Sequence, residues 1–367
     1  MPTKVLVDAW HLGGSSAQRG IGTYLREVLS RLADRDDMEL TGLAAAGTTL
    51  PSGVRHRRIW RVAPDRWAKR EHDLLLPVDL ALAARREGVD VVLSPADDPP
   101  SRSPAPWVQL LHDLIPVVVR DPAFAADAAR WRRVGGRLRE AAGVITCSRH
   151  TADDAMRVLG VDRARITVAP LGVDPRFRPP AARRPSDPPT ILYVGEYGPH
   201  KGFAEAFQVV AGLADVGLPH RLRMVGFLAP WYEPVVRGLL ERSPNPERVE
   251  LCGFVPDVVA AYQEADALVV TSRYEGFCLP ALEAMACGTP VVAFRNSAIP
   301  EVVGNGGRIV PDGDVDAMVR ALVEVIGDTD AREEASRRGV EQASRFTWEQ
   351  CVDTHAELFR SLADASP

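Results

Sequence analysis

Two glutamates, Glu275 and Glu283, flank a short turn that carries glycine and proline. Pro280 suits the first position of a helix, because it lacks the N–H that a helix start leaves unused. Gly288 suits the C-terminal end of the same helix. The backbone N–H groups of 276–279 and the helix N-terminus form a natural anion site. A carboxylate on each side of a phosphate can accept hydrogen bonds from a sugar and from a ribose. The spacing therefore predicts a site for a nucleotide-sugar.

Glutamates at this spacing also occur on solvated helices, so the surrounding residues decide between the two interpretations. The run Thr271–Val292 closely resembles the signature of retaining glycosyltransferases of family 4. The resemblance implies that Glu275 contacts the donor sugar and Glu283 the ribose. It also implies that the intervening backbone amides meet the sugar and the diphosphate; they belong to Gly276, Phe277, Cys278 and Leu279. The family usually has Gly at position 278, so Cys278 leaves the local backbone angle open.

A second group of residues opens the second half of the chain, in the run Val194–Gly202. Lys201 lies in a predicted strand-to-helix loop, where an ammonium is well placed to meet phosphate. It matches the family lysine that neutralises the diphosphate. Family members often have Arg where this chain has Glu196 and His200, so one positive charge is missing. The resemblance makes Lys201, together with Glu275 and His112, the predicted catalytic group.

Three further segments resemble family patterns. Phe254 and Val255 lie in a turn whose backbone contacts the nucleotide base in the family. Gly13 and Gly14 follow the first predicted strand, where glycines let the backbone approach a ligand closely. The resemblance places them at the donor phosphate and places Arg19, in the same loop, on the acceptor side.

Two residues of the first half complete the predicted acceptor side. His112 ends a predicted strand and matches a family motif in which a His lies near the transferred sugar. A lone His at such a position is also commonly a structural residue. Ser148 matches a family pattern near the interdomain cleft, and it marks the fold more than the chemistry.

Short apolar runs alternate with helix-like stretches along the whole chain, which predicts parallel α/β construction. The predicted strands are 5–7, 89–93, 107–111, 143–147, 166–168, 190–194, 221–225, 249–252, 267–270 and 290–293. A Pro-rich segment at 179–189 reads as a linker between a domain over 1–178 and a second over 190–345. The segment Asp330–Leu362 looks helical. The resemblance implies the GT-B fold, with two Rossmann-like domains facing each other across a cleft and a C-terminal helix (346–367) that returns to the first domain.

Composition narrows the class of protein further. The chain has 367 residues and a net charge of −5, which does not favour a nucleic-acid partner. Its five Cys form no C-x-x-C pair and predict reduced thiols. We expect a cytoplasmic protein, since the N-terminus lacks the apolar core of a signal peptide and no apolar run approaches the ~18 residues of a membrane span.

The resemblance covers nearly the whole chain and implies a retaining transfer of a hexose from a nucleoside diphosphate to an unidentified acceptor. The first-half motifs lean towards mannosyltransferases and thus GDP-mannose. In this scheme no cofactor and no metal is needed, because positive groups stabilise the diphosphate. Two alternatives stay open: another GT-B enzyme, such as a nucleotide-sugar epimerase or a phosphorylase, or a non-catalytic subunit that binds a nucleotide-sugar. The oligomeric state is not predicted.

A basic stretch with two Trp residues, 55–70, and a second basic run, 130–133, suggest contact with an anionic membrane. Solvated faces explain the same charges. Pro64 prevents one long amphipathic helix over the first stretch. We therefore expect at most weak peripheral contact with a membrane.

Overall fold

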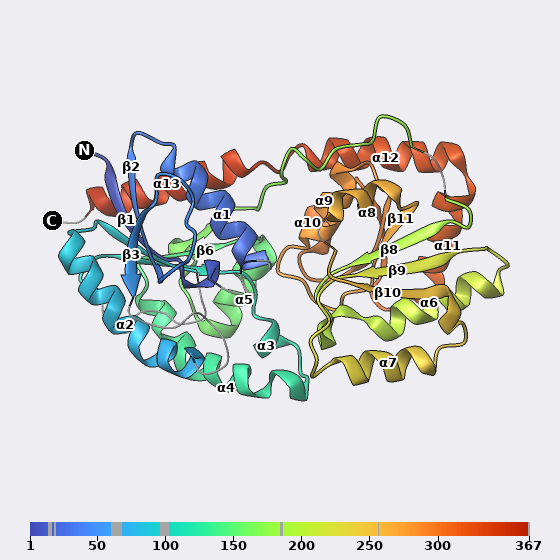
Figure 1. Cartoon of the computed structure of the whole chain (residues 1–367), viewed down its shortest axis with the longest axis horizontal. Coiled ribbons are helices and arrows are strands. Elements are labelled where there is room, and N and C mark those ends of the chain that lie inside the picture. Colours follow the sequence, from blue (N-terminus) through green and yellow to red (C-terminus); the bar gives the residue numbers. More distant parts are fainter. Residues whose placement is uncertain are drawn as a thin grey trace. The chain divides into compact units, whose positions relative to one another are not determined.

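The computed structural model describes residues 1–13, 17, 20–59, 68–95, 103–183, 186–255 and 257–365, leaving aside the side chains of 68–77, 133 and 134. The chain divides into two compact units. The first comprises Met1–Gly172 and Thr347–Pro367, and the second comprises Val173–Phe346. Each unit is built on one parallel sheet with helices packed against it (Figure 1).

The first unit contains a seven-stranded sheet of order β3-β2-β1-β4-β5-β6-β7. Its strands are β1 (Thr3–Asp8), β2 (Met38–Ala45), β3 (Arg55–Ile59), β4 (Val91–Ser94), β5 (Trp107–Leu111), β6 (Gly143–Thr146) and β7 (Ile166–Val168). Its helices are η1 (Trp10–Leu12), α1 (Gly20–Ala33), α2 (Ala68–Glu87), α3 (Ile115–Val118), η3 (Pro122–Phe124), α4 (Ala125–Val134), η4 (Gly135–Glu140), α5 (Arg149–Leu159), η5 (Arg163–Arg165) and α13 (Trp348–Asp364). The central strands are buried almost throughout, as expected of a parallel sheet covered on both faces.

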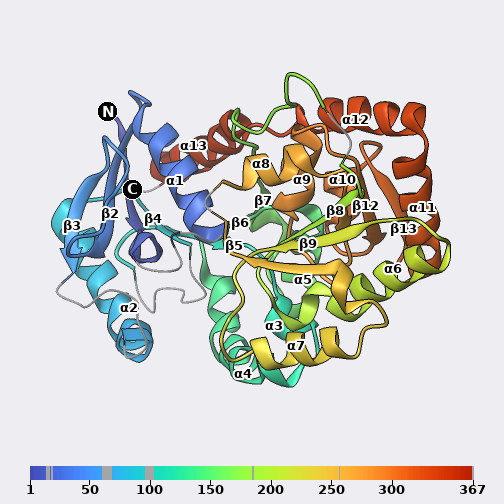
Figure 2. The ribbon, with the colours of Figure 1, turned by 45° about the vertical axis from the view of Figure 1, so that its right-hand side comes forward.

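The second unit contains a six-stranded sheet of order β10-β9-β8-β11-β12-β13. Its strands are β8 (Thr190–Val194), β9 (Arg221–Val225), β10 (Val249–Gly253), β11 (Ala267–Val270), β12 (Val291–Arg295) and β13 (Arg308–Pro311). Its helices are η6 (Pro199–Lys201), α6 (Phe203–Asp215), α7 (Glu233–Glu241), η7 (Pro246–Arg248), α8 (Val258–Glu264), α9 (Leu279–Ala286), α10 (Ile299–Val303), α11 (Val315–Gly327) and α12 (Thr329–Ala343). Figure 2 shows α6 and α7 on one face of this sheet and α8, α9 and α10 on the other.

The sequence predicted ten of these strands and missed β2, β3 and β13. β2 contains Gly42 and two alanines, β3 reads Arg-His-Arg-Arg-Ile, and β13 is short and ends in proline, so none of them looks like a buried apolar strand. The prediction that the segment Asp330–Leu362 is helical is confirmed by α12 and α13. The segment holds two helices, because the Thr347 hydroxyl accepts from the amide of Gln350 and starts α13 afresh.

The predicted linker 179–189 lies within the second compact unit. Arg183 ties it there: its guanidinium donates to the carbonyl of Gly288 (2.5 Å), to the carbonyl of Ala265 and to the Thr289 hydroxyl. The C-terminal helix α13 belongs to the first unit, where it packs against α1, β1 and β4. The return of this helix to the first domain is therefore confirmed.

Candidate active site

The second sheet has a strand order that reverses between β8 and β11. All its strands run parallel, so their C-terminal ends meet at one edge. In open α/β sheets, ligands bind outside those ends, at the point where the order reverses. The loop after β8 carries Lys201 and the loop after β11 carries Glu275, so the two predicted residues flank this point from either side.

Lys201 and Glu275 form an ion pair, with Lys201 Nζ 2.5 Å from Glu275 Oε1. Both side chains are nearly buried, at 12% and 10% exposure. The carbonyl of Lys201 accepts from the hydroxyls of Tyr193 (3.3 Å) and Thr271 (3.2 Å), which tie the first loop to β8 and to the end of β11. The Ser297 hydroxyl accepts from the amide of Glu275 at 2.8 Å. Residues from three strand ends thus hold the pair in place.

The close approach of the two loops depends on Gly202. This residue has φ +68°, and a Cβ there would lie 1.9 Å from the carbonyl oxygen of Thr271. Only glycine fits such a crossing without moving the backbone. Gly202 therefore lets the loop that carries Lys201 lie directly against the loop that leads to Glu275.

The electrostatics of the pair favour its charged form. Burial opposes ionisation of Glu275, but Lys201 beside it and hydrogen bonds from Lys201 and Ser272 outweigh burial and hold the pKa of the carboxyl below its usual value. Burial, with Lys201 nearby, lowers the pKa of His200 to about 3, so His200 is neutral at physiological pH. His200 therefore does not restore the positive charge that the family often has at this position.

The turn between the two glutamates presents backbone more than side chains. Phe277 and Cys278 are buried, and the Phe277 ring packs edge-on against Phe346. Cys278 adopts the left-handed conformation, with φ 83° and ψ 59°, which a residue other than glycine reaches only at a cost. The backbone angle that the sequence left open is therefore the glycine-like one. Helix α9 begins at Leu279, one residue before the predicted start at Pro280.

Glu283 lies on α9 with its carboxylate held by Tyr262, whose hydroxyl donates to Glu283 Oε2 at 2.8 Å. Burial raises the pKa of Glu283 to about 7, although the Tyr262 hydrogen bond and the nearby Arg176 act in the opposite direction. The carboxyl is thus divided between its two protonation states near neutral pH. Neither Tyr262 nor Arg176 could be predicted as a neighbour of Glu283, because neither lies in the recognised motif.

Phe254 and Val255 follow β10 at the same edge of the sheet. Gly253 precedes them with φ 66°, and its carbonyl accepts from the amide of Gly226 at 2.8 Å, which fixes the turn to the end of β9. The Phe254 side chain is 56% exposed. The turn thus offers an exposed aromatic face next to a fixed backbone.

Several predicted site residues belong to the first unit. Gly13 is buried after η1, and its amide donates to the carbonyl of Trp10, while Gly14 and Arg19 lie outside the described residues. Ser148 is buried at the start of α5, where its hydroxyl accepts from the amide of Thr151 at 3.0 Å. Ser148 thus caps the N-terminus of α5.

His112 follows β5, and burial lowers the pKa of its imidazole to about 4. Within the described part of the chain, its buried Nε2 has no hydrogen-bond partner. The ring lies edge-on to Tyr24, with centroids 5.2 Å apart and an interplanar angle of 89°. His112 is therefore a neutral imidazole whose Nε2 makes no hydrogen bond to another described residue.

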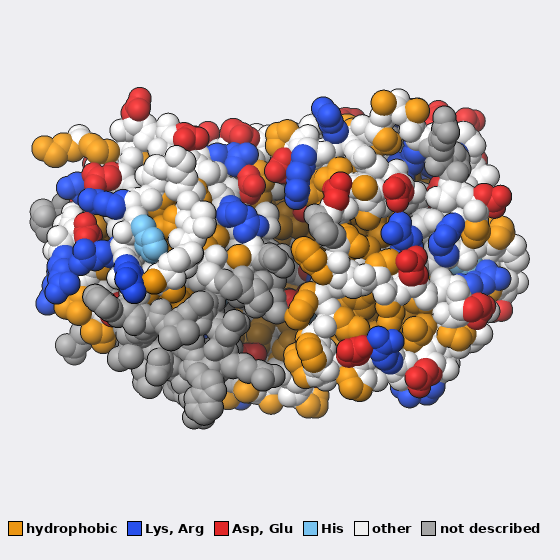
Figure 3. Space-filling model, in the orientation of Figure 1, with side chains coloured by type: hydrophobic (Ala, Val, Ile, Leu, Met, Phe, Trp, Pro, Cys, Tyr) orange, Lys and Arg blue, Asp and Glu red, His pale blue; other side chains and the backbone are white. Residues whose placement is uncertain are grey.

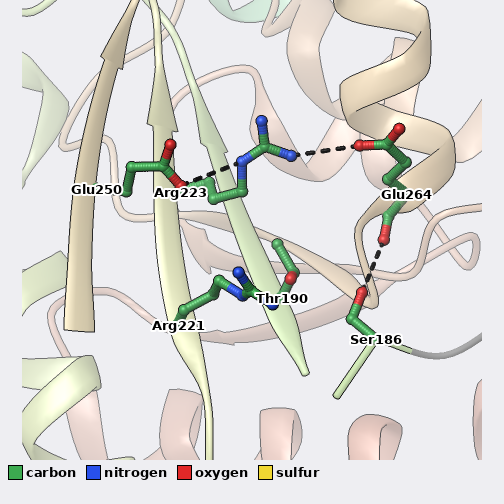
Figure 4. A pocket seen from close by; sticks show the side chains of 6 residues that line it. All are labelled: Ser186, Thr190, Arg221, Arg223, Glu250 and Glu264. Carbon is green, nitrogen blue, oxygen red and sulfur yellow. Dashed lines mark hydrogen bonds and ion pairs between the residues drawn. The ribbon is translucent and has the colours of Figure 1, made fainter. Parts of the chain in front are cut away.

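A separate pocket of about 330 Å³ lies where β8, β9 and β10 begin, at the edge opposite Lys201 and Glu275 (Figure 4). It is lined by Ser186, Thr190, Arg221, Arg223, Glu250 and Glu264. Arg223 is already neutralised there by Glu250 (3.5 Å) and Glu264 (3.3 Å). This pocket is far from the residues with predicted chemistry, and we do not assign the active site to it.

The basic strand β3 is largely neutralised by its neighbours. Arg55 pairs with Glu39 (2.7 Å) and Glu87 (3.6 Å), and Arg57 pairs with Glu87 (3.4 Å). Figure 3 shows Lys and Arg side chains interspersed with Asp and Glu over this end of the first unit. Trp60 and Trp67 lie outside the described residues.

Two general features of the described residues bear on the class of protein. None of their helices combines the length and the apolar character that crossing a bilayer requires. Among the same residues, no three His, Cys, Asp or Glu side chains gather in a way that suits a metal ion.

Known proteins resemble this chain in both halves. The profile described as Glycosyl transferases group 1 matches residues 176–342, and that of Glycosyltransferase Family 4 matches residues 18–177. O-antigen chain mannosyltransferase B of Escherichia coli is 35% identical over 176 residues, which is 47% of this chain and 45% of the relative. D-inositol 3-phosphate glycosyltransferase of Saccharomonospora viridis is 31% identical over 284 residues, 71% of this chain and 65% of the relative. The chain thus spans about half to two thirds of the length of these curated relatives.

Solved structures share the architecture over the whole chain. A sucrose-phosphate synthase from Thermosynechococcus elongatus has a TM-score of 0.84 at 22% identity, covering 100% of both chains. Anabaena HepE in complex with UDP and glucose has a TM-score of 0.76 at 18% identity, covering 98% of this chain and 100% of that one. At such identities the likeness establishes the two-domain α/β GT-B fold. With family profiles running from residue 18 to residue 342 on that fold, the chain belongs to the group 1 glycosyltransferases.

Proposed function

We propose that the chain is a retaining glycosyltransferase that moves a hexose from a nucleoside diphosphate to an acceptor hydroxyl. The observation that carries this proposal is the Lys201–Glu275 ion pair at the reversal point of the second sheet, directly before the N-terminus of α9. A cation and a helix N-terminus suit a diphosphate. A buried, ionised carboxylate beside them suits the hydroxyls of a sugar.

We propose a role for the predicted donor contacts of the second unit. Lys201 and the start of α9 stabilise the negative charge that grows on the diphosphate as it leaves. Glu275 accepts from sugar hydroxyls, and Glu283 accepts from the ribose. The backbone at Phe254 and Val255 meets the base.

The reaction needs no covalent intermediate with the protein. The bond between the anomeric carbon and the phosphate oxygen breaks, and the acceptor oxygen bonds to the same face of that carbon. The acceptor proton passes to the departing phosphate oxygen, which serves as the base. Glu275 positions the sugar rather than attacking it, and His112 is the residue that the family resemblance implies beside the transferred sugar. We infer that no divalent metal and no cofactor is needed, because Lys201 and α9 supply the positive potential.

The donor that we propose first is GDP-mannose. Two relatives are named as mannosyltransferases: the Escherichia coli protein described above and MMP alpha-(1->4)-mannosyltransferase of Mycolicibacterium hassiacum, which is 31% identical over 268 residues, 66% of this chain and 62% of the relative. The acceptor is left open. For membrane contact we keep the expectation of weak binding at most, supported by the pairing of Arg55 and Arg57 with glutamates.

A panel of nucleoside diphosphates and their sugars tests the donor by thermal shift. A ligand at 100 times its Kd stabilises by about 2.7 kcal/mol, which is readily seen. Product analysis with and without acceptor then separates transfer from epimerisation and phosphorolysis. A chain that binds a nucleotide-sugar tightly and turns over none of the acceptors would instead be a binding subunit.

Lys201→Ala tests the catalytic assignment and should lower turnover on the order of 10²-fold. The matched control is Arg273→Ala, which removes an exposed cation from the neighbouring loop, where it pairs with Glu205 at 2.7 Å. Turnover of the control should stay near that of the wild type. Transfer should also persist in excess EDTA, and its loss with recovery on adding magnesium or manganese would reject the metal-independent scheme.

A further inference from the structure

We propose that Tyr24 is a positioning residue for His112 and that His355, on the C-terminal helix, holds Tyr24 in place. The inference rests on the proposed role of His112 beside the transferred sugar. By this proposal a residue of α13 helps to position His112, although no residue of this helix belongs to a recognised motif.

The connection begins at the imidazole of His112. The backbone carbonyl of this residue accepts hydrogen bonds from Cys147 Sγ and from the Thr151 hydroxyl. Within the described part of the chain, the ring Nε2 has no hydrogen-bond partner. Packing therefore orients the ring, and the edge-on contact with Tyr24 at 5.2 Å is the aromatic contact that the structure records for it. A shift of Tyr24 would move Nε2 of His112 with it.

Tyr24 is held by a hydrogen bond across the first unit. Its hydroxyl lies 2.6 Å from His355 Nε2, and Nδ1 of His355 lies 2.7 Å from the carbonyl oxygen of Cys351. A carbonyl only accepts, so Nδ1 must carry the proton, Nε2 must accept, and the Tyr24 hydroxyl must donate. Burial lowers the pKa of His355 to about 4 and raises that of Tyr24 well above its usual value, so neither group changes charge near neutral pH.

This arrangement is fully enclosed. Tyr24 and His355 both have 0% exposure. On the outside, Arg31 of α1 binds Glu349 of α13 at 3.1 Å, and Arg35, in the loop after α1, binds Asp353 of α13 at 2.6 Å. If the buried Tyr24 hydroxyl lost its partner, no hydrogen bond would offset the free-energy cost of its desolvation. The bond to His355 therefore selects one position of the Tyr24 ring.

The test compares steady-state kinetics of point variants of the full chain. Tyr24→Phe keeps the ring and loses the hydroxyl, and His355→Phe leaves the Tyr24 hydroxyl without an acceptor. We expect each to lower kcat on the order of tenfold, as small misplacements of a reacting group do, while KM for the donor changes less than twofold. The double variant should be no worse than either single one. His355→Gln, whose side-chain oxygen can accept from Tyr24, should recover most of the loss.

The control is Arg35→Ala, which weakens the surface contact between α13 and the loop after α1 without touching Tyr24. It should lower the free energy of unfolding and leave kcat unchanged. If Tyr24→Phe likewise lowers stability but leaves kcat unchanged, Tyr24 is only a core residue and the proposal fails.

NMR of 15N-labelled histidine separates this proposal from the proposed function. The His112 imidazole signals should shift from their wild-type positions in Tyr24→Phe and in His355→Phe. In His355→Gln they should lie closer to the wild-type positions than in His355→Phe. If the wild-type chain transfers no sugar, the proposed function fails by that result alone. Unchanged His112 signals in Tyr24→Phe would then overturn the positioning role independently.

Discussion

At the scale of single residues, Lys201 serves two partners. It pairs with Glu275 at 2.5 Å, and in the proposed reaction it also neutralises the diphosphate. A diphosphate therefore competes with Glu275 for the same ammonium. When the diphosphate engages Lys201, the Glu275 carboxylate becomes available to the sugar hydroxyls, which couples recognition of the two halves of the donor.

This competition predicts an unusual result for Glu275→Gln. Removing the carboxylate charge should tighten binding of the free nucleoside diphosphate by about three- to tenfold, because one nearby negative charge is lost. Sugar transfer should fall on the order of 10²-fold. Titration calorimetry measures the first effect, with Glu205→Gln as the control, since Glu205 pairs with the exposed Arg273 instead. Weaker binding in Glu275→Gln would show that the carboxylate helps to hold the diphosphate.

The raised pKa of Glu283 predicts that the stability of the folded chain depends on pH. Its pKa is raised to about 7 in the folded chain, against 4.5 for a free glutamate. A raised pKa contributes stability that is complete below the unfolded value and is lost as pH rises through the folded value. The free energy of unfolding of the wild-type chain should therefore fall between about pH 4.5 and pH 7.5. The fall due to Glu283 should be on the order of 1–3 kcal/mol and should be absent in Glu283→Gln.

Urea unfolding of both chains at pH 5 and pH 8.5 measures this difference. Other groups also titrate over this range, but they are common to the two chains and cancel in the comparison. Parallel pH profiles for the wild type and Glu283→Gln would show that the carboxyl titrates at its ordinary value.

At the scale of elements, the start of α9 depends on an unusual backbone angle. Cys278 has φ 83° directly before the helix, and its side chain is buried. Burial also raises the pKa of the thiol well above its usual value, so Cys278 contributes shape and not a nucleophile. This left-handed residue leads the chain into α9, whose first amides we propose as contacts of the diphosphate.

Substitutions at position 278 should follow that backbone requirement. Cys278→Gly should keep donor binding and transfer, since glycine reaches φ > 0 freely. Cys278→Val should weaken nucleotide binding at least tenfold, about 1.4 kcal/mol, because a β-branched residue resists this angle and shifts the turn. Calorimetry with the nucleoside diphosphate compares the two. Equal affinities would mean that the amides of this turn do not contact the ligand.

At the scale of the whole chain, the path of the backbone returns to the first unit at α13. Gly172 is the last residue of the first segment of that unit, and Trp348 starts its C-terminal helix. A Cβ at Gly172 would lie 2.1 Å from the backbone nitrogen of Trp348. The backbone segments at Gly172 and at Trp348 therefore approach each other so closely that only glycine fits at position 172.

Gly172→Ala should accordingly destabilise the first unit by about 1–3 kcal/mol, because backbone must move to admit the methyl group. Gly327→Ala is the matched control: it ends α11, and nothing lies within 4 Å of its added Cβ. Chemical denaturation followed by tryptophan fluorescence reports mainly on the first unit, to which six of the seven Trp of the chain belong. An unchanged midpoint in Gly172→Ala would show that the crossing is looser than the structure has it.

Much of the fold followed from local patterns. Central parallel strands are buried on both faces, so β8 and β11 are short, largely apolar runs with the predicted limits. Strands β3 and β13 lie at sheet edges, where a basic or proline-ending segment can still pair. Their sequences therefore carried no strand signal.

The sequence by itself determined the family motif, the glutamates of the turn and the lysine of the opposite loop, because their residue types and spacing are local. Only the tertiary structure brought together partners far apart in the chain. Lys201 and Glu275 are 74 positions apart, and Tyr24 and His355 are 331 apart. The pKa of Glu283 likewise depends on burial and on Tyr262, which no neighbouring residue reveals. Hydrogen bonds and desolvation act through space, so these features were decided by packing and not by sequence spacing.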